Sequence, residues 1–485
     1  MDAQAILEIR PALTEYLHEF DGCFANVRSQ RHLATYVGGQ LSDLQRKSVE
    51  PMADAAGVSP RTLQEFLSLA RWDECVARDR LQRRVARRHG SRSSIGTIDE
   101  TSYVKKGNQT ACVQRQHCGA AGKTENCVVS VHLGYAAGDF HTLLDGEPYL
   151  PEETWHNNRV RCQAAGIPDE VVYRPKWQMA LTQYRRAVGN GVRFAWLTFD
   201  EGYGGKPPFM RELDACGQNY VGEIPVSFVG WTVPPEVLHR QLPCDKRTGR
   251  PRKFPRLKVR HTPACEVRDL LKYSPILRRV PWVAYHVKDG EKGPMVWEAK
   301  CVAFWIKDER GLPAGPYHLL ICRNALDPTE VKFFLSNAPM DTPVTELLLV
   351  AFDRWRVERM FEDSKGDLGL DHFEVRRYGS LCRHLLLTCV SHLFLAEYCQ
   401  RQKKRRGIDG ASGVDGDADT GGPVVLRWPM LAESGRIDRG AIGDNAGTKR
   451  QSATQPPKAN GTTITGPRLQ TKQPDPMSVA QNVAL

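Results

Sequence analysis

The sequence predicts a mixed α/β fold that is preceded by a helical domain and interrupted by a β-rich insertion. Three changes of pattern along the 485 residues indicate this organisation. Apolar residues recur at helical spacing in residues 1–92, strand-like alternation begins at residue 95, and residues 205–340 are rich in proline and short strand-like runs. The chain is also longer than most single domains, so we expect several folded units.

The helical region contains a pattern that is typical of a helix-turn-helix. In the segment 51–72 (PMADAAGVSPRTLQEFLSLARW), two helical stretches are separated by Gly57 to Pro60, with Ser59 placed as an N-cap and Pro60 as the first helical residue. Such a motif contacts DNA, whereas plain packing of two helices gives the same pattern. We therefore expect residues 1–92 to form a helical DNA-binding domain.

A one-sided basic stretch follows this motif, between residues 78 and 92, with Asp79 as its single acidic residue. It favours contact with phosphate groups, and the alternative is a solvated helix face. The predicted contacts are Arg83, Arg84, Arg87 and Arg88. The formal charge of +11 and the isoelectric point near 9.0 are compatible with a polyanionic partner but do not identify one.

From residue 95, three strand-like segments are followed by a helix at 177–188 with a glycine stop after it, and then by an apolar strand at 192–200. The three strand-like segments are 95–104, 111–119 and 126–136. This order matches the opening of a ribonuclease H-like mixed sheet with helices on both faces, in which the first and fourth strands lie side by side. Asp99 and Asp200 should then lie near each other.

These two aspartates, and a later glutamate, are the candidate metal ligands. Asp99 interrupts an apolar strand, and Asp200 ends another at the edge where sites of α/β sheets gather. Hard cations such as Mg²⁺ require carboxylate oxygens. In a helix predicted from about residue 344 to Gly366, Arg354, Glu358 and Lys365 share one face, which suits a metal-bound phosphodiester, or else a salt-bridged surface helix.

The remaining segments complete the predicted domains. Residues 93–204 and 341–400 form the catalytic domain, residues 205–340 the β-rich insertion, and residues 401–485 a polar tail that we expect to be disordered. A second basic stretch lies in the insertion and is predicted to run along DNA, unless it is a solvated loop; it includes Lys246, Arg247, Arg250, Arg252, Lys253, Arg256 and Lys258.

The sequence gives no sign of export or of a membrane span. The N-terminus is acidic where a secretory signal is basic, and the longest apolar runs are far shorter than a bilayer requires. The 14 cysteines contain no CxxC pair, which argues against a zinc site. We expect a cytoplasmic, nucleoid-associated protein.

Four segments resemble, in order, the motif blocks of DDE insertion-sequence transposases with a YREK signature: IDETSYVKKG, RQHCGAAGKTENC, LTFDEGYG and RWRVERMFEDSKGDLGLDHFEVR. Arg354, Glu358 and Lys365 fit the signature, whereas Ala351 stands at the tyrosine position. The resemblance implies that Asp99, Asp200 and Glu358 are catalytic and hold two Mg²⁺ ions, which Mn²⁺ can replace. Three neighbouring glutamates are then not ligands, namely Glu100, Glu201 and Glu362.

The same resemblance implies cut-and-paste transposition of double-stranded DNA between terminal inverted repeats and a target, carried out by a homodimer. Excision is expected to pass through a hairpin, which forces a base out of the stack. Trp282 or Trp297 of the insertion is predicted to hold that base, against the alternative that each is a core residue. The other functions left open are a catalytically inactive DNA-binding regulator and a ribonuclease H-like nuclease.

Overall fold

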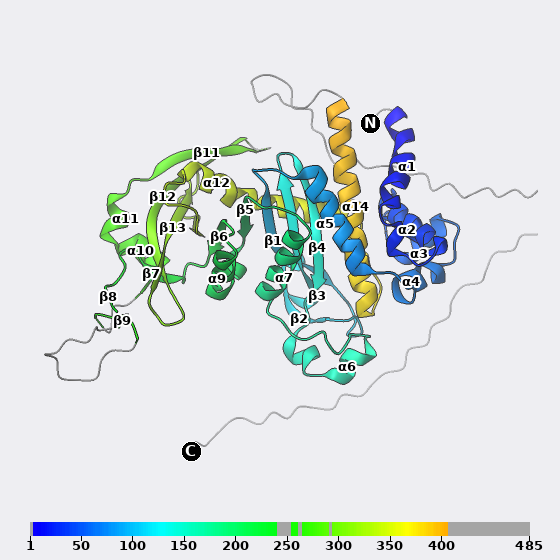
Figure 1. Cartoon of the computed structure of the whole chain (residues 1–485), viewed down its shortest axis with the longest axis horizontal. Helices are drawn as coiled ribbons and strands as arrows, with labels where there is room; N and C mark the ends of the chain where they lie inside the picture. Colours follow the sequence, from blue (N-terminus) through cyan, green and yellow to red (C-terminus); the bar gives the residue numbers. More distant parts are fainter. Residues whose placement is uncertain (1–2, 240–253, 260–263, 291–292, 406–485) are drawn as a thin grey trace, which may run out of the picture. The chain divides into compact units, whose positions relative to one another are not determined.

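The computed structural model describes residues 3–239, 254–259, 264–290 and 293–405. Five of the predicted DNA contacts, Lys246, Arg247, Arg250, Arg252 and Lys253, lie outside these residues, as does the predicted tail beyond Arg405. The described part contains a large mixed sheet flanked by helices (Figure 1). The predicted mixed α/β class is confirmed.

The middle of the sheet has the strand order β4-β3-β1-β5-β6. Strand β1 pairs antiparallel with β3 and parallel with β5, and β5 pairs parallel with β6. The predicted neighbourhood of the first strand and the strand ending at Asp200 is therefore confirmed, and the arrangement is consistent with a ribonuclease H-like fold. The bounds are β1 (Ile95–Val104), β3 (Lys123–Ala137), β4 (Phe140–Pro148), β5 (Trp196–Phe199) and β6 (Tyr220–Ile224).

Two strand predictions need correction. The segment predicted as a strand at 111–119 contributes only the short β2 (Gln114–Cys118), which pairs with the beginning of β3. Strand β4 is not indicated by the sequence pattern, because Asp145, Gly146 and Pro148 are residue types that strands disfavour. Asp145 is nevertheless buried in β4, where Arg78 at 3.0 Å and Arg186 at 2.5 Å neutralise it.

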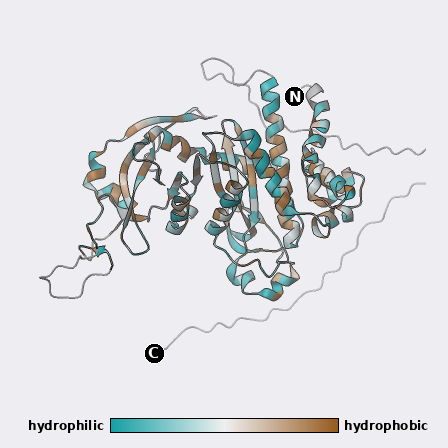
Figure 2. Ribbon diagram, viewed as in Figure 1, coloured by the Kyte–Doolittle hydropathy of each residue, from teal (hydrophilic) through white to brown (hydrophobic). Residues whose placement is uncertain are grey.

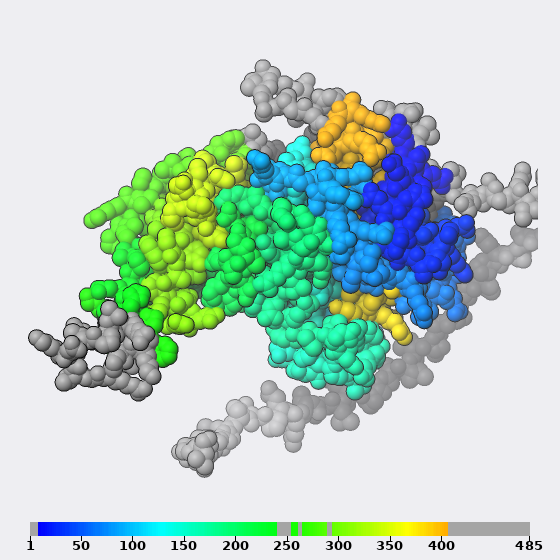
Figure 3. Space-filling view, in the orientation of Figure 1, coloured from blue at the N-terminus to red at the C-terminus, as the bar shows by residue number. Residues whose placement is uncertain are grey.

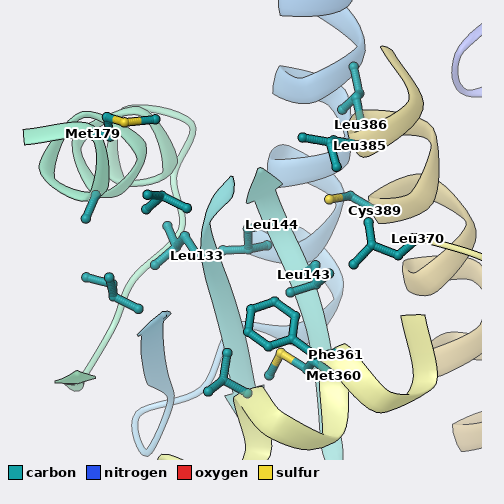
Figure 4. Packing of buried hydrophobic residues seen from close by; sticks show 14 of the residues in the cluster. Leu133, Leu143, Leu144, Met179, Met360, Phe361, Leu370, Leu385, Leu386 and Cys389 are labelled. Carbon is teal, nitrogen blue, oxygen red and sulfur yellow. The ribbon is translucent and has the colours of Figure 1, made fainter. Parts of the chain in front are cut away.

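Helices cover both faces of the central strands. Helix α7 (Lys176–Gly189), as predicted, packs on β3, and α13 (Trp355–Gly366) and the long α14 (Tyr378–Arg405) pack on β1, β3 and β4. Figure 4 shows Leu133 pointing toward Met179 of α7, with Phe361 and Leu143 on the side of α14. The sheet is thus buried on both faces, which makes it a rigid base for side chains at its edge.

The N-terminal helices pack against α14. They are α1 (Ala3–His18), α2 (Val27–Gln40), α3 (Val49–Ala55), α4 (Pro60–Ser68) and α5 (Glu74–His89). Helices α3 and α4 are the two helices of the predicted helix-turn-helix, with Ser59 at the N-cap position and Pro60 in the first turn. In the space-filling view the first helices, in dark blue, adjoin the end of α14, in orange (Figure 3).

Helix α14 is long and apolar enough to cross a membrane, but 78% of its apolar 18-residue window is buried within the protein. Its apolar turns contact β4, α2 and α4, whereas the end near Arg405 is coloured as hydrophilic (Figure 2). This burial is that of a core helix.

The β-rich region continues the central sheet. Strand β14 (Val331–Ser336) pairs antiparallel with β6, and the sheet extends through β13 (Pro313–Asn324), β12 (Gly293–Lys307) and β7 (Val229–Trp231) to β10 (Cys265–Glu266), with β11 (Val283–Gly290) also on β12. The two-stranded pair β8 (Val237–Leu238) and β9 (Arg256–Leu257) is separate. The boundary predicted at residue 205 therefore falls within a continuous structure, since α8 (Glu201–Gly204), α9 (Pro207–Ala215) and β6 connect the two regions.

A second hydrophobic core lies under α12 (Val344–Asp353). Leu347, Leu348 and Ala351 of this helix pack with Trp196, Phe334 and other residues of the sheet. The helix predicted as one element from residue 344 is divided at Arg354, which separates α12 from α13. Helices α10 (Val267–Tyr273), α11 (Pro275–Arg279) and α6 (Arg159–Ala164) instead contribute Val267, Leu277 and Cys162 to the main hydrophobic core.

Candidate active site

Asp99 and Asp200 stand next to each other at the centre of the sheet. In the parallel pairing of β1 with β5, Ile98 lies opposite Phe199, so the next residue of each chain segment is one of the two aspartates. Neighbouring strands run about 4.8 Å apart. The juxtaposition predicted from the sequence is therefore present in the fold.

The backbone after β5 fixes the side chain of Asp200. Asp200 is the N-cap of α8, and its Oδ1 accepts hydrogen bonds from the backbone N–H groups of Gly202 at 3.0 Å and Tyr203 at 3.3 Å. Burial and the charge of Glu100 raise the pKa of Asp200, while Arg354 and these N–H groups act in the opposite direction. The Asp200 carboxylate is thus held in place, while burial and the charge of Glu100 disfavour its charged form.

Asp99 is in a more costly environment. Burial raises the pKa of Asp99 to about 7, and the charge of Asp200 adds to the rise, although Arg354 and the N–H group of Glu100 lower it. Such a shift arises when burial removes a carboxylate from water and a neighbouring carboxylate adds negative charge. An additional cation beside Asp99 would relieve this repulsion.

Helix α13 carries the third candidate ligand, Glu358, in its first turn. Val357, Met360 and Phe361 are buried and seat the helix on β1, β3 and β4. The side chain of Glu358 lies on another face of the helix, 62% exposed, and accepts a hydrogen bond from Arg354 at 3.3 Å. Seven residues later, the ammonium group of Lys365 lies 6.0 Å from the centre of the Tyr103 ring, and burial lowers its pKa.

Arg354 connects the carboxylates of three different elements. Its guanidinium donates to Asp99 at 3.0 Å and to Glu358 at 3.3 Å, and it lies 4.0 Å from Glu223 of β6. Glu223 is not among the candidates predicted from the sequence. A signal was present, because Glu223 is a single carboxylate in the apolar run YVGEI, as Asp99 is in its own strand.

The three glutamates set aside as non-ligands have other surroundings. Glu100 forms an ion pair with Lys176 at 2.5 Å, and Glu362 is 72% exposed with Arg359 at 3.5 Å. Glu201 is exposed in the first turn of α8. Of these, Glu100 is the nearest to the site, since its charge raises the pKa of Asp200.

Comparisons with known proteins identify the family of this chain. A family of proteins described as DDE superfamily endonucleases matches residues 19–294, more than half of the chain. The chain belongs to the DDE superfamily of endonucleases. The matched region includes Asp99 and Asp200 and ends before Glu358, so the third ligand is argued from the resemblance and from the position of α13.

One relative of this DDE endonuclease is described as a probable transposase for insertion sequence element IS701, from Microchaete diplosiphon. The two proteins are 32% identical over 211 residues, which is 43% of this chain. The match spans 52% of the length of that relative.

Endonucleases of the DDE superfamily generally use divalent metal ions, and the donor set here fits such an ion. Asp99 and Asp200 offer half-buried carboxylates, and a cation would offset the negative charge that raises the pKa of each. Among the described residues, no group of three His, Cys, Asp or Glu side chains is close enough to form a metal cluster in this conformation. In this conformation Arg354 pairs with Asp99 and with Glu358.

The basic helix α5 divides into two kinds of arginine. Arg83, Arg87 and Arg88 have side chains that are 56%, 67% and 49% exposed. The prediction for Arg84 is wrong, since its side chain is 4% exposed, donates to Glu397 at 2.5 and 2.8 Å and also pairs with Glu19. It is internal because helical periodicity turns this position toward α14.

The two candidate tryptophans differ in burial. Trp297 is buried beneath α12, 4.7 Å from the ring centre of Phe352, so the alternative that it is a core residue holds. Trp282 is partly buried. The guanidinium of Arg323 lies 4.3 Å and the ammonium of Lys300 lies 4.8 Å from the centre of its ring. Trp355, directly after Arg354, is not among the tryptophans predicted from the sequence to hold a base. It is 43% exposed, and the ammonium of Lys288 lies 3.8 Å from the centre of its ring.

Proposed function

We propose that this DDE endonuclease is the transposase of an insertion sequence and that Asp99, Asp200 and Glu358 are its metal ligands. The observation that carries the proposal is the placement of Asp99 and Asp200 side by side on parallel strands, with Glu358 linked to Asp99 through Arg354. The similarity to a probable transposase supports the choice of reaction.

The metal ions, proposed to be two Mg²⁺, would supply charge stabilisation and a more nucleophilic oxygen for phosphoryl transfer. Asp99 and Asp200 would hold the ions on the rigid sheet, and Glu358 would approach from α13. Arg354 and Lys365 would contact phosphate oxygens, since Lys365 lies on the same helix as Glu358 and Arg354 caps that helix and pairs with Glu358. Ala351 is buried between α12 and the sheet and offers no hydroxyl group for this purpose.

The proposed DNA path includes the exposed arginines of α5. Arg83, Arg87 and Arg88 would contact backbone phosphates, which position DNA without reading its sequence. The stretch from Lys246 to Lys253 would add contacts along the same duplex. The partner DNA would be the terminal inverted repeats and the target, and the active complex a homodimer.

The hairpin route requires an aromatic surface for the displaced base. Trp355 meets this requirement better than Trp297, because it is exposed and adjoins Arg354, which contacts Asp99. Lys288 over its ring adds a cation that would favour a nearby phosphate. We therefore assign the stacking role to Trp355 in place of Trp297, with Trp282 as the second position to test.

The decisive experiment uses DNA that carries both ends of the element, with Mg²⁺. A transposase excises the element and joins its ends to a second DNA, and it requires both ends. Equal cleavage of DNA that lacks the ends would indicate a nuclease. Binding of the ends without cleavage would indicate an inactive regulator. Asp200→Asn should abolish cleavage, and the matched control is Glu201→Gln, whose exposed side chain is the next residue.

A further inference from the structure

Arg354 is placed where a metal ion is expected. Its guanidinium contacts Asp99 and Glu358, two of the three proposed ligands, and is only 21% exposed. The third carboxylate near it is Glu223, at 4.0 Å, which is also paired with Lys332 at 3.2 Å. Lys332 neutralises part of the charge of Glu223, so the closest ion pairs of Arg354 are those with the proposed metal ligands.

Both oxygens of Asp99 are already engaged. Oδ1 accepts a hydrogen bond from the backbone N–H of Glu100 at 2.7 Å, and Oδ2 accepts one from Arg354 at 3.0 Å. A divalent ion that reaches Oδ2 must displace the guanidinium or remain next to a fixed positive charge. A guanidinium is not deprotonated in proteins, so it cannot avoid the conflict by losing a proton.

The position of Arg354 in the chain allows such a displacement. It lies between α12 and α13, where the helical hydrogen bonding is interrupted, and its backbone forms the cap of both helices. The neighbouring Trp355 is exposed, so this junction is at the surface. The side chain can turn toward solvent without moving the buried residues that seat either helix.

We propose that Arg354 is a positioning residue that exchanges with metal: it holds Asp99 and Glu358 in the DNA-free protein, and a DNA phosphate draws it away so that a divalent ion can bind. This inference rests on the proposed function. It makes metal binding and DNA binding mutually favourable. A DNA phosphate removes Arg354 from the position that the ion needs, and a bound ion releases Arg354 for the phosphate. The DNA-free protein would thereby be kept from holding a fully loaded, reactive site.

The test measures Mn²⁺ binding to the full chain by calorimetry, without any cleavage readout. Arg354→Gln should bind Mn²⁺ at least about tenfold more tightly than the wild type when DNA is absent, which corresponds to about 1.4 kcal/mol. The matched control is Arg356→Gln, since Arg356 is 22% exposed, close to the 21% of Arg354, and pairs with Asp353 at the end of α12. A merely structural role for Arg354 would weaken Mn²⁺ binding in the variant.

A second arm adds a double-stranded oligonucleotide of unrelated sequence as the source of phosphates. It should tighten Mn²⁺ binding to the wild type and have a smaller effect on Arg354→Gln. Unchanged or weaker Mn²⁺ binding by folded Arg354→Gln would overturn the exchange. If Asp99→Asn still abolishes Mn²⁺ binding in that case, the metal site stands and only this inference fails. If Asp99→Asn binds Mn²⁺ as the wild type does, the proposed function itself fails.

Discussion

Two clusters of arginine and carboxylate in this protein have opposite electrostatics. At the junction of α5 and α14, burial alone would raise the pKa of Glu397, but hydrogen bonds from His89 and Arg84 lower it to about 2. At the centre of the sheet, burial and Asp200 raise the pKa of Asp99 to about 7 despite Arg354. The first cluster is balanced and closed, whereas the second has an excess of negative charge. That excess distinguishes a site that takes up a cation from an internal ion pair.

The largest expected effect on stability comes from breaking the balanced cluster. Arg84→Ala leaves Glu397 buried without its main partner, which should lower the free energy of unfolding by about 4 kcal/mol. Urea unfolding followed by circular dichroism measures this loss. Arg87→Ala, on the same helix but exposed, should change stability by less than about 0.5 kcal/mol. A loss as small for Arg84→Ala would remove the contrast between the two clusters.

The aromatic residues provide a second contrast. Trp297→Ala should cost about 3 kcal/mol of stability, because it opens a cavity beneath α12. Trp355→Ala should leave unfolding nearly unchanged but weaken stacking of a displaced base by roughly 1 to 3 kcal/mol. Fluorescence of 2-aminopurine near the end of the DNA reports that stacking. An unchanged signal in Trp355→Ala, with a changed one in Trp282→Ala, would move the stacking role to Trp282.

Acid should open the balanced cluster. The pKa of Glu397 in the folded protein, about 2, lies below its ordinary value of 4.5, so the unfolded state binds the proton first as pH falls. Its contribution is fully present above about pH 4.5 and is lost toward pH 2, at roughly 3 kcal/mol. Unfolding measured across this range should show a flatter pH dependence for Glu397→Gln. Equal slopes for the two proteins would exclude Glu397 as the source.

The smallest expected effect per residue concerns the exposed arginines. Changing Arg83, Arg87 and Arg88 to glutamine should lower the salt dependence of DNA binding by roughly one unit of slope per lost phosphate contact. Binding titrations at several salt concentrations measure this slope. Arg185→Gln is the control, because Arg185 is 52% exposed but lies on α7 in an ion pair with Glu212. An unchanged slope in the triple variant would indicate that these arginines form a solvated helix face and do not contact DNA.

The sequence predicted those parts of the site that depend on regular geometry. The register of Asp99 with Asp200 follows from two apolar strands that pair in parallel, and the shared face of Arg354, Glu358 and Lys365 follows from helical spacing. Strand β4 could not be recognised, because its Asp145 is tolerated only through Arg78 and Arg186 from distant helices. Such compensation is visible only in three dimensions.

The same limit explains the errors in the predicted DNA contacts. In the sequence of α5, Arg84 and Arg87 are equivalent basic residues. In the structure, Arg84 pairs with the buried Glu397, whereas the side chain of Arg87 is 67% exposed. Likewise, Trp297 and Trp355 are equivalent in a sequence, and only the position of α12 over the sheet makes the first a core residue. A residue's type indicates what it can bind, and its burial decides whether it is available.

The central claim is that Glu358 completes the site with Asp99 and Asp200, and it is tested most directly by comparing Glu358→Gln with Glu362→Gln in Mg²⁺-dependent cleavage of the element ends. Both glutamates are exposed on α13, four residues apart, so folding and surface charge change alike. Glu358→Gln should reduce the rate of cleavage at least about a thousandfold, or about 4 kcal/mol in the barrier, while binding of the ends persists. Glu362→Gln should cleave as the wild type does. Full activity of Glu358→Gln, or an equal loss in Glu362→Gln, would contradict the assignment.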